Sequence, residues 1–179
     1  IEKAHFVGIS LGTILIRELA EAYPERMQSM VLAGAVIRLT PRLHFLIGIA
    51  NAFKKIVPFM WLYRLFAWIL MPKKTHETSR SLFVQEAKKI KQKEFLRWLT
   101  LTGDIAKYLI KINEKESDVP CLYIMGEEDY VFLEPVKRLV KQFRNTELSV
   151  LENSGHVCNV DQAQKFNEVS LNFLNNCIS

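Results

Sequence analysis

Apolar and polar positions follow two alternating patterns along the chain. Short apolar runs bounded by Gly, Asn, Ser or Pro are typical of strands buried in a parallel sheet. They occupy residues 2–7, 29–34, 119–126 and 147–151. Apolar residues recur with a helical period over residues 11–23, 133–143 and 163–174. Because strands and helices alternate, we expect βαβ crossovers and an α/β fold built on a parallel sheet.

A long helical segment, roughly 38–115, separates the second predicted strand from the third. Its apolar residues follow the i, i+3, i+4, i+7 spacing of amphipathic helices twice. The two sets are Leu46, Ile49, Ala50 and Phe53, then Leu62, Leu65, Phe66 and Ile69. A basic helical stretch follows over 79–102. We therefore predict a helical lid, 38–115, inserted into a core formed by 1–37 and 116–179.

Charge separates this segment from the remainder of the chain. The net charge is +5, but residues 38–115 carry 16 Lys and Arg against 5 Asp and Glu, a local balance of +11. No apolar run approaches the ~18 residues that a membrane span needs. The basic, Trp-containing segment favours an anionic membrane surface as a partner, or else it is a solvated helix face. Nucleic acid is not expected, because no recognised motif accompanies the charge.

Three cysteines, an odd number with no C-x-x-C spacing, indicate neither a disulfide framework nor a zinc site. This usage favours a reducing, cytoplasmic compartment. No signal-peptide pattern is visible before the first apolar run in this sequence. The chain starts at Ile1, inside a predicted strand, which suggests a fragment or a processed chain.

The sequence Gly8-Ile9-Ser10-Leu11-Gly12 lies where the first strand meets the first helix. It has the G-x-S-x-G pattern of a nucleophile elbow, in which a serine occupies a strained turn and glycines let strand and helix approach closely. The alternative is a serine that only caps the helix. The strand-to-helix context favours Ser10 as a nucleophile.

A serine nucleophile needs a histidine base and a carboxylate that orients it, in the chain order Ser, Asp or Glu, His. Asp129 follows the third strand, and His156 follows the fourth, so both belong at the carboxyl edge of the sheet. Glu127 and Glu128 are alternative candidates for the acid, but they lie closer to the end of the strand and would need a different loop path. The structural alternative for Asp129 is a residue that only caps its loop. The alternative for His156 is an exposed loop histidine without a catalytic role.

The other histidines occupy less favourable positions. His5 lies inside the first strand, where packing is the expected role, and His44 and His76 belong to the helical segment. We therefore expect none of them to be the base.

Four segments resemble, in order and spacing, the C-terminal part of an α/β-hydrolase-fold protein with a helical lid. They are "HFVGISLGT", "AYPERMQSMVLAG", "PCLYIMGEEDYVF" and "LENSGHVCNVDQAQKFNEVSLNFL". The resemblance implies a triad of Ser10, His156 and Asp129, with the Leu11 N–H as one oxyanion donor. Some relatives carry the acid after the next strand, but "AGAVIRLTP" has no carboxylate, which favours Asp129. The upstream strands and the turn that supplies the other oxyanion donor are absent from this sequence.

These features predict a serine hydrolase that cleaves a carboxylic ester or related acyl compound, with an apolar acyl group and no metal or organic cofactor. Acyltransferases, carbon–carbon bond hydrolases and cofactor-free peroxidases share the triad and the fold. A non-catalytic ligand-binding protein is the alternative from another class. Besides a small-molecule acyl substrate, we expect self-association, or pairing with an N-terminal fragment, at the open sheet edge.

Overall fold

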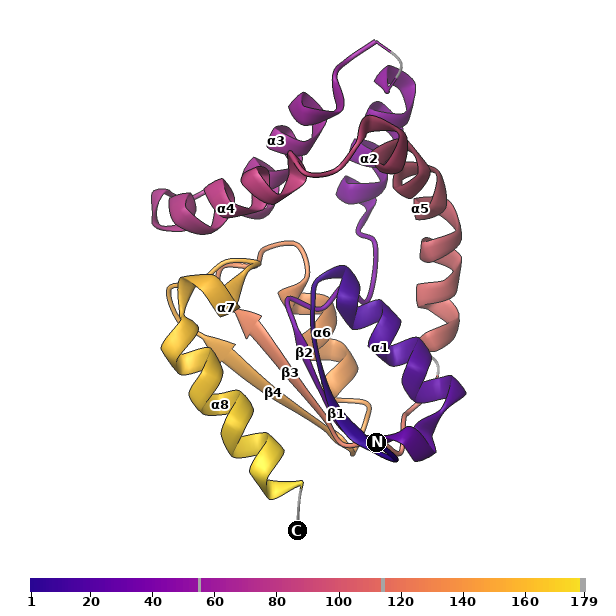
Figure 1. The fold of residues 1–179 in the computed structure, drawn as a ribbon, viewed down its shortest axis with the longest axis vertical. Coiled ribbons are helices and arrows are strands. Elements are labelled where there is room, and N and C mark those ends of the chain that lie inside the picture. Colours follow the sequence, from indigo (N-terminus) through magenta and orange to yellow (C-terminus); the bar gives the residue numbers. More distant parts are fainter. Residues whose placement is uncertain (55, 114, 178–179) are drawn as a thin grey trace.

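A computed structural model describes residues 1–54, 56–113 and 115–177. Its centre is a parallel four-stranded sheet with the order β1-β2-β3-β4 (Figure 1). The strands are β1 (Ala4–Ile9), β2 (Met27–Ala33), β3 (Cys121–Gly126) and β4 (Thr146–Leu151). Each begins within two residues of its predicted start, so the prediction of an α/β fold with a parallel sheet is confirmed.

The two inner strands are almost completely buried, whereas β1 lies at an edge of the sheet. Within the described chain β1 pairs only with β2, in a register that aligns Phe6 with Met30 and Ile9 with Ala33. Val7 and Ile9 remain 49% and 37% exposed. An edge strand of this kind presents unpaired N–H and C=O groups on its outer side.

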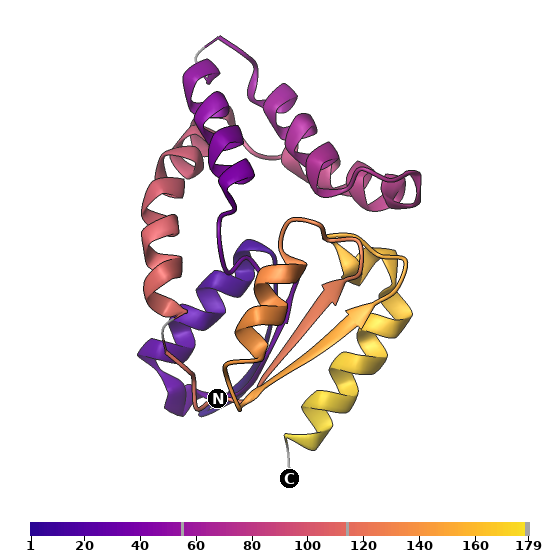
Figure 2. The ribbon, with the colours of Figure 1, turned by 180° about the vertical axis from the view of Figure 1, so that it is seen from behind.

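Helices cover both faces of the sheet. On one face, α1 (Leu11–Ala22) and α6 (Leu133–Val140) pack against Leu32 and Tyr123. On the other, α8 (Ala163–Asn176) places Phe166 and Phe173 against Val31, and Figures 1 and 2 show α8 apart from α1 and α6. Successive strand residues point to opposite faces, which is why neighbouring residues of β2 enter different clusters. The short elements η1 (Pro24–Arg26) and α7 (Cys158–Asp161) complete this part.

The described residues between β2 and β3 form four α-helices. They are α2 (Pro41–Phe53), α3 (Phe59–Leu70), α4 (Glu77–Ala87) and α5 (Gln92–Ile112), with the 3-10 turn η2 (Lys74–His76) before α4. Figure 1 shows α3 and α4 across the end of the molecule toward which the strand arrows point. No helix in the described part of the chain is long and apolar enough to cross a membrane.

One detail of this region differs from the sequence-based expectation, and another adds to it. Helix α3 buries Ala67 and Leu70 and leaves Leu65, placed on the expected apolar face, 49% exposed. Because α3 is apolar almost all round, its period does not select the buried face. The basic helical stretch 79–102 is divided between α4 and α5, a break that the sequence pattern did not locate. Helix α5 restarts at residue 92, where the Glu94 carboxylate accepts the Lys91 N–H.

Helix α5 reaches from this region down to the core. Its C-terminal half places Leu109 and Ile112 in the same apolar cluster as α1 and β2. The buried Arg17 side chain of α1 donates a hydrogen bond to the Ile112 carbonyl at 3.1 Å. In both views α5 runs beside α1 (Figures 1 and 2), so it serves as the crossover helix that returns the chain to β3.

Candidate active site

The turn between β1 and α1 holds Ser10 in a strained conformation. Ser10 has φ 52° and ψ −117°, a combination that only glycine adopts freely, and it is one of two described non-glycine residues with positive φ. Its N–H donates to the Ala33 carbonyl at 2.9 Å, which fixes the turn against the end of β2. The buried Thr13 hydroxyl donates to the Ser10 carbonyl at 2.5 Å. Neighbouring contacts therefore maintain the strain.

The two glycines of the elbow contribute differently. A Cβ at Gly8 would lie 2.5 Å from the Ile16 side chain and 3.0 Å from the backbone of Gly12, so strand and helix approach closely there. A Cβ at Gly12 would meet nothing within 4 Å among the described residues. The close approach expected of both glycines is therefore found only at Gly8.

Asp129 lies in the loop between β3 and α6 and is fully buried. Its Oδ1 accepts the N–H of Phe132 at 3.0 Å and that of Val131 at 3.3 Å, at the start of α6. Its Oδ2 lies 2.8 Å from Nδ1 of His156. One carboxylate oxygen therefore anchors the acid to its own loop, and the other orients the imidazole.

His156 follows β4 and is 1% exposed. Because Asp129 accepts at Nδ1, that nitrogen carries the proton, and Nε2 presents its lone pair. Nε2 lies 2.9 Å from the Ser10 hydroxyl oxygen, which donates to it. The Phe132 ring packs against the imidazole with centroids 5.1 Å apart. Residues separated by 146 positions in the chain thus form one continuous hydrogen-bonded series.

Gly34, directly after β2, allows the histidine loop to come this close. It has φ +52°, and a Cβ there would lie 2.4 Å from the His156 carbonyl oxygen and 3.4 Å from the imidazole. Only a residue without a side chain fits between the end of β2 and His156.

The Leu11 N–H lies in the first turn of α1, where helix N–H groups have no partner within the helix. It directly follows Ser10, and the positive end of the helix dipole is at this terminus. This position suits stabilisation of an anion that forms beside the serine.

The alternative acids and bases lie elsewhere. Glu127 is exposed, and Glu128 contacts Lys73 and His76 rather than His156. His5 hydrogen-bonds Ser29 at 2.7 Å between neighbouring strands, and the exposed His44 contacts the carbonyl of its own helix cap. None of these groups reaches Ser10 in the described structure.

One residue that sequence reasoning placed only in the helical segment lies beside the triad loops. His76, at the end of η2, is fully buried. Its Nε2 lies 2.7 Å from Oε2 of Glu128, the residue before Asp129. A Cβ at Gly155, the residue before His156, would lie 2.9–3.2 Å from the His76 ring. No sequence signal distinguishes His76, because helical periodicity does not report contacts between distant segments.

Cys158 is the other potential nucleophile near the site. Burial, assisted by the negative charges of Asp129 and Asp161, raises the pKa of its thiol to about 12, so it stays protonated at neutral pH. Its Sγ lies 3.6 Å from the Ile124 carbonyl oxygen. Among residues 1–54, 56–113 and 115–177, no group of three or more His, Cys, Asp or Glu is placed to hold a metal ion.

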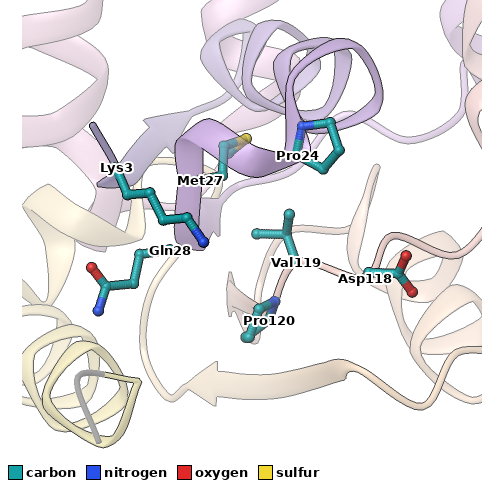
Figure 3. Close-up of a pocket in the computed structure, with 7 residues that line it drawn as sticks. All are labelled: Lys3, Pro24, Met27, Gln28, Asp118, Val119 and Pro120. Atoms are coloured by element: carbon teal, nitrogen blue, oxygen red, sulfur yellow. The ribbon is translucent and has the colours of Figure 1, made fainter. Parts of the chain in front are cut away.

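Two surface depressions lie away from the triad. One of about 440 Å³ is at the amino ends of the strands, beside Met27 and Pro120, with Lys3 and Asp118 at its sides (Figure 3). Another of about 250 Å³ lies between α2 and α5, beside His44 and Leu99. Neither includes a residue of the triad, which is at the carboxyl edge of the sheet, where α/β folds bind ligands.

Comparison with known proteins agrees with this arrangement. Residues 1–163 match the family described as alpha/beta hydrolase fold. A comparison with curated proteins found no match.

Solved structures are similar over nearly the whole chain. A bromoperoxidase from Bacillus anthracis has 20% identity and a TM-score of 0.76, over 98% of this chain and 68% of its own. A thermophilic esterase has 24% identity and a TM-score of 0.74, over 98% and 67%. A meta-cleavage product hydrolase from Pseudomonas fluorescens IP01 has 24% identity and a TM-score of 0.71, over 98% and 66%. At this identity the likeness shows the fold, and the chain spans about two thirds of the length of these structures.

Proposed function

Because the chain belongs to the α/β-hydrolase fold family, we propose that the complete protein is a serine hydrolase that cleaves a carboxylic ester or a related acyl compound. The observation that carries this proposal is the hydrogen-bonded series from Ser10 through His156 to Asp129, with contacts of 2.9 and 2.8 Å. A serine held in a strained turn at one end of such a series is arranged for nucleophilic attack.

In the acylation step, the Ser10 oxygen attacks the carbonyl carbon while its proton passes to Nε2 of His156. Asp129 stabilises the imidazolium through Nδ1 and keeps the ring oriented. The carbonyl oxygen becomes an oxyanion that accepts the Leu11 N–H. As the carbon–oxygen bond to the leaving group breaks, Nε2 returns its proton to the departing alcohol, and Ser10 carries the acyl group as an ester.

Deacylation repeats these transfers with water. Nε2 of His156 takes a proton from a water molecule as its oxygen attacks the acyl carbon. The second oxyanion collapses, the bond to the Ser10 oxygen breaks, and that oxygen regains the proton from Nε2. The products are the carboxylic acid and the original serine.

We propose an apolar acyl group for the substrate. Apolar side chains of the helical region, among them Leu43, Leu70 and Met71, belong to one cluster with Phe132, whose ring packs on His156. The surroundings of the base on this side are therefore largely apolar, which favours a hydrocarbon acyl chain. An esterase is among the similar structures beside a meta-cleavage product hydrolase and a bromoperoxidase, so the ester series below is needed to distinguish ester cleavage from the other reactions of the fold.

The test uses the complete protein with a fluorophosphonate probe and a series of nitrophenyl esters of increasing chain length. We expect covalent labelling of Ser10 and a preference for medium-chain esters over acetate. Ser10→Ala is the matched control, and it should lose both labelling and turnover. If wild-type protein binds esters but neither labels nor turns over, the protein is a non-catalytic ligand-binding member of the fold. A preference for acetyl esters would contradict the apolar acyl group.

A second candidate function, docking on an anionic membrane surface, is favoured by the tryptophans of the helical region. All three, Trp61, Trp68 and Trp98, are between 49% and 66% exposed, in a segment whose charge balance is +11. Trp61 and Trp68 lie seven residues apart on one face of α3, with Arg64 between them. Aromatic rings beside basic groups suit the boundary between anionic headgroups and acyl chains.

Co-sedimentation with vesicles tests this docking. Wild-type protein should bind vesicles that contain phosphatidylserine, lose binding as salt is raised, and bind neutral vesicles weakly. Trp68→Ser should weaken binding, whereas Tyr23→Ser, an exposed aromatic position outside the helical region, should not. Equal binding of both variants, or of neutral and anionic vesicles, would contradict the docking.

A further inference from the structure

His76 connects the helical region to the two loops that carry the acid and the base. Although it belongs to η2, its ring is 0% exposed and lies over Gly155. Its Nε2 is 2.7 Å from Oε2 of Glu128, although the two groups are not aligned for a hydrogen bond. His76 Nδ1 has no hydrogen-bond partner among the described residues. Burying an imidazole with so few partners costs free energy, and such a group in a native structure calls for an explanation.

Local hydrogen bonds hold His76 in place. Its N–H donates to the Lys73 carbonyl at 3.3 Å, and its own carbonyl accepts the Ser79 hydroxyl at 3.0 Å at the start of α4. The Arg80 guanidinium donates to the carbonyls of Met71 and Lys73, at 2.6 and 3.2 Å. The turn that presents His76 is therefore fixed on both sides.

Glu128 is the point at which the two triad loops and η2 meet. Its N–H donates to the Ser154 carbonyl at 2.9 Å, which joins the acid loop to the histidine loop. Its carboxylate lies 2.6 Å from the Lys73 ammonium through Oε1 and 2.7 Å from His76 through Oε2. A shift of Glu128 therefore also moves the backbone of Asp129, which is the next residue in the chain.

We propose that His76 is a positioning residue for the triad. Its ring lies over Gly155 and beside the Glu128 carboxylate, and it thereby sets the backbone position of His156 and Asp129 from a segment that contributes no triad group. This role rests on the proposed hydrolase function, because it concerns the alignment of the same site. A displacement of about 1 Å in such a site can lower the rate by about 100-fold.

Replacement of His76 in the full-length protein provides the main test. His76→Phe keeps a buried ring without its nitrogens, and His76→Gln keeps a polar nitrogen that can face Glu128. We expect His76→Phe to lower kcat by about 10- to 100-fold with KM changed by less than about threefold, since alignment, not binding, is lost. His76→Gln should recover most of that loss. His44→Phe, the same change at an exposed histidine of the helical region, should keep wild-type kcat.

A double-mutant cycle tests whether His76 acts through Glu128. Residues that act as a unit are non-additive, so His76→Phe combined with Glu128→Gln should lose no more kcat than His76→Phe alone. Multiplicative losses, a kcat of His76→Phe within about twofold of wild type, or an effect confined to KM would overturn the proposal. If His76→Phe does not fold, a comparison of Glu128→Gln with Glu127→Gln replaces it. Glu127 is the matched control, because it carries the same carboxyl group one residue earlier but is exposed. Only Glu128→Gln should lower kcat.

Proton NMR of the full-length protein separates this role from the proposed function. The proton between His156 Nδ1 and Asp129 should give a strongly downfield signal that Asp129→Asn removes. His76→Phe should shift or broaden that signal, and His44→Phe should leave it unchanged. If wild-type protein shows no ester turnover and no labelling, the hydrolase proposal fails, and this signal still decides the positioning. An unchanged signal in His76→Phe would overturn it.

Discussion

Because Ser10 lies in a strained turn, we expect a non-glycine residue at this position to lower the free energy of unfolding of the protein. A non-glycine residue at φ 52° and ψ −117° costs about 1–3 kcal/mol. Glycine removes this strain but adds about 0.5–1 kcal/mol of unfolded-chain entropy. Alanine keeps the Cβ and therefore the strain. Both substitutions remove the hydroxyl that hydrogen-bonds to His156, so the loss of this hydrogen bond does not contribute to the stability difference between the two variants.

Ser10→Gly should therefore be more stable than Ser10→Ala by about 1 kcal/mol, although both abolish ester turnover. For a chain of this size, that difference raises Tm by about 2–4 °C. Thermal denaturation of the two variants, followed by circular dichroism, measures the difference, and urea titration checks it with an unchanged m-value. An Ser10→Gly variant no more stable than Ser10→Ala would show that the turn stores no strain. More than about a tenth of wild-type kcat in either would remove Ser10 from the nucleophile role.

Four further outcomes follow from the site and the sheet. Asp129→Asn should lower kcat by about 10⁴-fold, because an amide favours the wrong tautomer of His156, and steady-state kinetics with the same esters measure it. Gly34→Ala should lower the free energy of unfolding by about 2–4 kcal/mol in urea titrations, because its Cβ meets the His156 carbonyl at a positive φ. The hydrogen bond from Lys73 lowers the pKa of the Glu128 carboxyl from its ordinary value of 4.5, so its stabilisation is complete above pH 4.5 and is lost as pH falls through the lower folded value. Glu128→Gln should remove this acid-dependent part of the unfolding free energy, and an identical pH dependence would refute it. Residues 1–179 expressed alone should self-associate through the open edge of β1, and a monodisperse monomer in light scattering would contradict this.

The sheet and the positions of Ser10, Asp129 and His156 were predictable because they depend on local patterns. Short apolar runs marked the strands, and the carboxyl ends of parallel strands lie at one edge. Polar residues that directly follow different strands are therefore brought close to one another at this edge. The chain order of serine, acid and histidine then selected three residues, and the structure brings all three within hydrogen-bonding distance.

The contacts of the helical region were not predictable in the same way. Helix α3 is apolar on nearly every side, so no period indicated that Leu65 would be exposed and Leu70 buried. His76 is separated from Glu128 by all of α4, α5 and β3, and only tertiary packing brings them together. Charge patterns likewise indicated a basic surface without indicating that Lys73 would pair with the acid loop.

Helix α5 has a mechanical consequence for the helical region. Its 21 residues form one continuous rod about 30 Å long. One end adjoins α3 through the contact of Phe95 with Phe59, and the other is attached to the core through Ile112 and Arg17. A helix attached at both ends resists bending and therefore links the position of α3 to the core. We expect a displacement of α3 and α4 relative to the sheet to reach the triad loops through His76, because that residue lies against both loops.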